Sequence, residues 1–189
     1  MLVLNTANEF LIEYAVRTPF VSFPVKLFLV GHAAELYLKV ALATLDKAAD
    51  VRRFGHDIAR LIAACNAKSN GALADYVLRQ AVLDCDFSGS WNDSHPIFTA
   101  IGSEDREHYF NHQELYHVAK ALVDVRYWGG FMRTTKLWNS AMVWPNPYWP
   151  GFFRGLRALF GSPVPGAIVH AVESGRLAPE SEHFLRQLL

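Results

Sequence analysis

The stretch PVKLFLVGHAAELYLKVALATLDK, residues Pro24 to Lys47, decides the fold predicted for this chain. Ser22 can accept a hydrogen bond from a first-turn N–H, and Pro24 lies so early in the helix that its missing N–H costs nothing. Apolar residues lie on nearly all faces of this segment, which is typical of a helix enclosed by other helices. The stretch therefore predicts a central helix around which a helical bundle packs.

Three polar side chains interrupt this apolar helix and share one stripe at spacings of three and four: His32, Glu35 and Lys39. Glu35 and Lys39 form an i,i+4 pair in the favoured order. An unpaired charge in a mostly buried helix is expensive, so the stripe must find partners. We expect either a polar pocket completed by His56 and Arg126, or a core network that fixes the helix register and needs no ligand.

Length and composition indicate one globular domain with a good core and an appendage, because the chain has 189 residues of which 51% are hydrophobic. The 18 basic and 18 acidic residues balance, so no strong overall field draws the chain to nucleic acid or to a membrane. The two cysteines, Cys65 and Cys85, lack metal-ligand spacing and indicate a reducing compartment. With no secretory signal pattern, and with charges in the middle of the apolar helix, we expect a cytoplasmic protein without a membrane span.

Periodicity and turn residues predict an all-α chain without internal repeats. Residues 18–23 and 84–103 read as loops, and residues 48–55 as a polar link. Residues 131–160 are rich in Trp and Pro and predict an irregular or short-stranded lid. The other predicted helices are 5–17, one that begins after a cap at Asp57 and is broken at Asn70-Gly71, 73–83, 103–127, 164–174 and 179–188.

The central stripe and the link after it resemble the signature of HEPN domains. The matching residues are His32-Ala-Ala-Glu35-Leu-Tyr-Leu-Lys39, followed by Gly55-His56-Asp57-Ile58. The resemblance covers about residues 5–127; Arg126-Tyr127 matches a late Arg-Tyr-Pro stretch of the family, with Trp128 in place of the proline. It implies an up-and-down helical bundle over residues 1–128, with residues 129–189 as an extension packed on it.

Membership of that family would carry expectations about function. HEPN domains are usually homodimers, and many belong to toxin–antitoxin or other nucleic-acid defence systems, often beside a nucleotidyltransferase. The resemblance therefore implies RNA or nucleotide binding or a scaffolding role, with an antitoxin or nucleotidyltransferase as a partner protein. It implies no cofactor and no metal.

Active HEPN domains cut RNA without metal through an Arg, followed by a polar residue, and a His a short interval later. Arg106 and His112 have five residues between them, although Glu107 follows the Arg, and His108 offers a second imidazole. Imidazole suits deprotonation of the 2′-OH, and guanidinium suits the charge of the phosphorane. The alternative is a solvated helix start in which acidic neighbours of Arg106 favour the helix dipole.

Other functions stay open on the residues alone. A structural or partner-binding dimeric helical module without catalysis is the main alternative, and a metal-dependent bundle enzyme is a third, suggested by Glu114-x-x-His117 and Glu180-x-x-His183. The aromatic segment 131–160 is interleaved with Arg and Lys, so it predicts either a base-stacking surface or a layer that seals one face of the bundle.

Overall fold

The computed structural model describes residues 2–17, 23–73, 148–160 and 166–189, and these form six α-helices and one 3-10 helix with no strand among them. The all-α prediction is confirmed for this part of the chain. The α-helices are α1 (Leu2–Arg17), α2 (Phe23–Leu45), α3 (Ile58–Lys68), α10 (Tyr148–Phe160), α11 (Gly166–Glu173) and α12 (Pro179–Leu188), and the 3-10 helix η1 is Val51–Phe54. The predicted helices 73–83 and 103–127 and the loop 84–103 lie outside the described residues.

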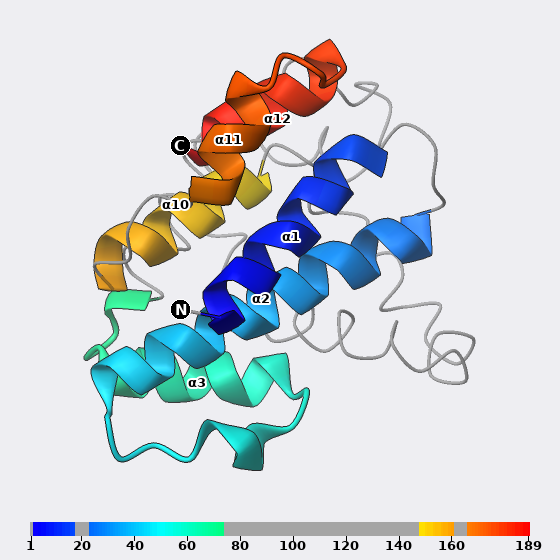
Figure 1. Ribbon diagram of the computed structural model, residues 1–189. Helices are drawn as coiled ribbons and strands as arrows, with labels where there is room; N and C mark the ends of the chain where they lie inside the picture. Colours follow the sequence, from blue (N-terminus) through cyan, green and yellow to red (C-terminus); the bar gives the residue numbers. More distant parts are fainter. Residues whose placement is uncertain (1, 18–22, 74–147, 161–165) are drawn as a thin grey trace, which may run out of the picture.

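The helices α1 and α2 lie side by side and form the centre of the described structure (Figure 1). In the view of Figure 1, α3 lies below them and packs against α2, whereas α10, α11 and α12 lie above. The helix α10 contacts α2, and both α11 and α12 contact α1. The packing of α2 thus confirms the predicted central position of the Pro24–Lys47 stretch. The helix runs from Phe23 to Leu45.

Apolar stripes with helical spacing explain why these helices pack. In α1 the buried positions Ala7, Leu11, Tyr14 and Ala15 recur at intervals of three and four and form one face. In α2 the apolar residues lie on several faces of the helix, and α1, α3 and α10 pack against these faces. One connected core therefore includes residues from Ala7 at one end of the chain to Leu188 at the other.

An aspartate side chain caps the start of η1, and a second one caps the start of α3. Asp50 Oδ1 accepts a hydrogen bond from the Arg52 N–H at 3.1 Å, and Asp57 Oδ1 accepts one from the Arg60 N–H at 3.0 Å. Each carboxylate satisfies a backbone donor that the helix start leaves without an intrahelical acceptor. The cap at Asp57 is present as predicted, while η1 is an element that the polar composition of residues 48–55 did not indicate.

The prediction of an irregular or short-stranded segment up to residue 160 is wrong for its last part, because Tyr148–Phe160 is an α-helix. Pro150 lies in the first turn, where its missing N–H has no intrahelical acceptor to lose. Phe152, Phe153, Leu156 and Phe160 are buried at helical spacing. The density of Pro and Trp hides this period, since both are typical of irregular structure.

Candidate functional site

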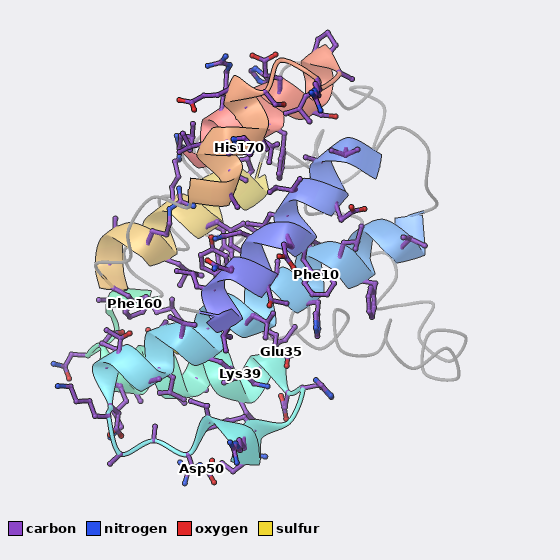
Figure 2. The ribbon with its side chains drawn as sticks, viewed as in Figure 1. Phe10, Glu35, Lys39, Asp50, Phe160 and His170 are labelled. Carbon is purple, nitrogen blue, oxygen red and sulfur yellow. The ribbon has the colours of Figure 1, made fainter. Side chains whose placement is uncertain are left out.

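A buried carboxylate is the centre of the polar cluster that the structure places on α2. The side chain of Glu35 is 1% exposed, and three nitrogen-bearing side chains surround it. Lys39 Nζ donates to Glu35 Oε1 at 2.8 Å, and His32 Nδ1 lies 3.8 Å from Glu35 Oε2. Figure 2 shows Glu35 and Lys39 on the same part of α2. The sequence stripe is therefore a stripe of contacting groups.

His56 reaches the same carboxylate from the turn that precedes α3. Its Nδ1 lies 3.1 Å from Glu35 Oε1 and 3.3 Å from Oε2, although the two residues are 21 positions apart. A carboxylate at neutral pH only accepts hydrogen bonds, so Nδ1 of His56 carries the hydrogen and donates it. This assignment fixes the tautomer of the neutral ring.

Exposure differs sharply across this cluster, which consists of His32, Glu35, Lys39 and His56. Glu35 is buried, whereas the His32 and Lys39 side chains are 23% and 19% exposed and His56 is 50% exposed. The negative charge is thus held inside and the basic groups are nearer to water. Such an arrangement pairs a buried charge with hydrogen bonds, as its desolvation requires.

His32 is packed between two aromatic rings and has one nitrogen without a hydrogen bond. Its imidazole stacks on Phe28 with centroids 5.8 Å apart, and it meets Phe10 edge-on at 4.4 Å. Its Nδ1 is buried and has no hydrogen-bond partner in the described part of the chain, because 3.8 Å to Glu35 is too long for one. His32 is therefore held mainly by its ring contacts, and it joins the cluster more loosely than Lys39 and His56 do.

Three exposed arginines flank His56 on the turn formed by η1 and the start of α3: Arg52, Arg53 and Arg60. The guanidinium groups of Arg53 and Arg60 lie over the buried ring of Phe54, 5.1 Å and 5.5 Å from its centroid. Within the described ranges, none of the three makes an ion pair.

The acidic residues nearest in sequence to these arginines have other partners. Asp46 forms an ion pair with Lys68 at 2.7 Å, and the carboxylate oxygens of Asp50 and Asp57 accept from the backbone at the helix starts. The Lys68 hydrogen bond is the main reason why the pKa of Asp46 is lowered. The guanidinium groups of the turn are therefore presented to solvent as positive groups, and we call Arg52, Arg53, His56 and Arg60 the basic turn.

Several residues proposed from the sequence cannot be placed. Arg106, His108, His112 and Arg126 lie outside the described residues, as do Glu114 and His117. Of the polar pocket or network, the structure brings together His32, Glu35, Lys39 and His56, that is, all members except Arg126. Among the residues that the structure describes, no group of three or more His, Cys, Asp or Glu is arranged to hold a metal ion.

The remaining candidate chemistry has structural explanations. Burial raises the pKa of the Cys65 thiol to about 12, and its Sγ–H donates to the Leu38 carbonyl at 3.4 Å. A thiol that stays protonated is a poor nucleophile, so Cys65 belongs to the core. The rings of Phe152, Phe153 and Phe160 are buried, so in this part of the aromatic segment they seal the core rather than stack bases.

A buried arginine outside the Glu35 cluster is not indicated by its residue type. Arg157 belongs to the cations interleaved in the aromatic segment, but its side chain is buried and lies beside Tyr37 of α2. Its position could be inferred only from the helical period of α10, which places residue 157 one position after the buried Leu156 and four after Phe153.

In comparisons with known proteins, no family model, curated protein or solved structure matches the chain. Within α2, the window Phe28–Leu45 is long and apolar enough to cross a membrane, with mean hydropathy 1.4, and half of it is buried in the fold. Core helices of soluble proteins meet the same criterion.

Proposed function

We propose that the chain is a HEPN-like nucleic-acid-binding protein that contacts RNA phosphates through the basic turn. The observation that supports this most directly is the set of three exposed guanidinium groups beside His56, without ion pairs in the described part of the chain. Guanidinium forms forked, charge-assisted hydrogen bonds with phosphate oxygens. Contacts of this kind supply most of the affinity for a nucleic-acid backbone.

The contacts of the signature residues add to this proposal. Glu35 and Lys39 on α2 and His56 before α3 come from the two halves of the pattern that resembles HEPN domains, and both Lys39 and His56 contact Glu35. The buried carboxylate holds the His56 ring at the surface of the turn, and Arg53 and Arg60 are held against Phe54. Groups fixed in this way lose less conformational entropy when a phosphate binds.

Replacing Arg53 and Arg60 together with Gln should weaken binding of labelled single-stranded RNA. Loss of two phosphate contacts should lower the slope of log affinity against log salt concentration by about 1.4. The measurement is fluorescence anisotropy across a salt series. The matched control is Arg176→Gln with Arg186→Gln, which removes two exposed positive charges near the C-terminus and should leave the slope unchanged.

If both double variants bind RNA like the parent, the basic turn is not the contact surface. If the parent binds no RNA on a broad panel, the proposal is wrong, and a structural or partner-binding helical module becomes the better account. Circular dichroism separates a loss of RNA binding from a general loss of folding, since only an unfolded variant would change its spectrum.

Metal-independent cleavage is a further part of the proposal and depends on Arg106 and His112. Incubation of the protein with labelled RNA in EDTA should give cleavage products, and both Arg106→Ala and His112→Ala should abolish them, because the first removes the cation and the second the base. Cleavage that survived both substitutions would place the chemistry elsewhere. Binding without any cleavage would retain the RNA-binding proposal and remove the nuclease activity from it.

A further inference from the structure

A positively charged side chain lies in the interior of the described structure without a negative partner. Arg157 of α10 is 5% exposed, and its neighbours along the helix, Phe153 and Leu156, are fully buried. The ion pairs formed in the described ranges use the carboxylates of Glu35, Asp46 and Glu182, and none involves Arg157. Arginine is almost never buried to this extent unless it is paired.

Among the described residues, the group that Arg157 acts on is neutral. The guanidinium lies close enough to the Tyr37 hydroxyl of α2 to oppose the rise of its pKa, and that hydroxyl donates in turn to Asn8 Oδ1 of α1. Asn8 and Tyr37 are 2% and 3% exposed. A buried polar chain thus crosses three helices, from α1 through α2 to α10, and it carries one formal positive charge.

Tyr37 does not supply the missing negative charge at neutral pH. Burial raises the pKa of its phenol, and the nearby charge and hydrogen bond of Arg157 oppose that rise without reversing it. The phenol is therefore neutral, and its single hydrogen is already donated to Asn8. The oxygen that remains can only accept from the guanidinium.

One hydrogen-bond donor of this buried polar group is not satisfied by the described residues. Arg157 Nη1 is buried and has no hydrogen-bond partner among the residues that the structure describes. Asn8 uses its oxygen for Tyr37, so its amide nitrogen is the donor end of that side chain. What would satisfy this group of residues is an acceptor with a negative charge, because an unpaired buried charge costs several kcal/mol in a protein interior.

We propose that Arg157, held in position by the chain of Tyr37 and Asn8, binds the oxyanion group of a small ligand, a phosphate or a carboxylate, at Nη1 of the guanidinium. The forked donors of arginine match both groups, and an oxyanion would supply the missing charge and the missing acceptor at once. This site is on α10, α2 and α1, and it does not depend on RNA binding by the basic turn.

Inorganic phosphate and acetate, each compared with chloride at equal ionic strength and pH, test the proposal on the whole chain. At ten times its dissociation constant, the anion that binds should lower the equilibrium constant of unfolding about tenfold. Urea denaturation measures this change, and isothermal titration calorimetry gives the stoichiometry. A phosphate effect without an acetate effect assigns the site to phosphoryl groups, and the reverse assigns it to carboxylates.

Arg157→Met should abolish the anion effect, and Arg157→Lys should weaken binding on the order of tenfold, since a lysine keeps the charge but loses the fork. Arg154→Met is the matched control, because Arg154 is exposed on the same helix and its loss removes the same charge. Tyr37→Phe keeps the guanidinium and serves if Arg157→Met does not fold; it should bind the anion more weakly than the parent.

Absence of any anion effect on the parent protein would overturn the proposal, and the charge of Arg157 would then be compensated by the chain itself. An anion effect that persists in Arg157→Met, or one that Arg154→Met also abolishes, would place the anion elsewhere and would overturn it equally. An unchanged affinity in Tyr37→Phe would contradict the role given to the tyrosine hydroxyl.

Discussion

Phe153→Ala should lower the free energy of unfolding by about 4 kcal/mol, the largest loss we expect from a single substitution in this protein. The ring of Phe153 is fully buried, and it lies 5.1 Å from the ring of Tyr37 and 5.2 Å from that of Phe152. The substitution would lose the free energy gained by burying the ring and both ring contacts, and it would leave a cavity between α10 and α2. Urea denaturation followed by circular dichroism measures the loss.

Phe28→Ala is the matched control for that substitution, because Phe28 is 40% exposed. We expect it to cost about 1 kcal/mol, mostly through its stacking on His32. Similar losses for both variants would contradict the packing of α10 against α2 and, with it, the interior position of Arg157.

Glu35→Ala should lower the free energy of unfolding by about 3 kcal/mol at neutral pH. The substitution removes the acceptor for Lys39 and His56 and leaves their donors beside a buried position. Since both partners are partly exposed, water can solvate them in part, so we expect the lower end of the range for a broken buried pair. Glu9→Ala, on an exposed position of α1, is the control and should cost about 0.5 kcal/mol or less.

Glu35→Leu combined with Lys39→Met tests whether the loss comes from unpaired charge. The double variant has neither the buried carboxylate nor the lysine that pairs with it, so it should be more stable than Glu35→Ala. If the double variant is as unstable as Glu35→Ala, the loss reflects packing around position 35 rather than electrostatics. If Glu35→Ala behaves like Glu9→Ala, the cluster contributes little to folding.

The central helix was predictable because its signal is local. A continuous apolar run with a proline at its start defines Phe23–Leu45 to within two residues, and the bounds 179–188 of α12 follow from Pro179 and the apolar period after it. The contact between Glu35 and Lys39 also follows from helix geometry alone. The contact of His56 with Glu35 does not follow from helix geometry. The two residues are 21 positions apart, and local sequence signals do not determine where the turn before α3 meets α2.

The segment Tyr148–Phe160 shows where local signals fail. Its proline and tryptophan indicate irregular structure, whereas the helical period of its buried residues, Phe152, Phe153, Leu156 and Phe160, belongs to α10. The burial of Arg157 does not follow from its residue type, because charge and length place arginine at the surface by default, and only tertiary packing overrides that preference.

The contact between the two ends of the described chain affects how the protein forms. The Ser181 hydroxyl of α12 donates to the Ala15 carbonyl of α1 at 2.8 Å, 166 positions away, and Phe184 lies against Tyr14. Contacts of such high sequence separation must wait for a long loop to close, which slows folding. On the ribosome, α1 would emerge long before α12, and the part of its apolar surface that α12 covers would stay uncovered until α12 has been synthesised.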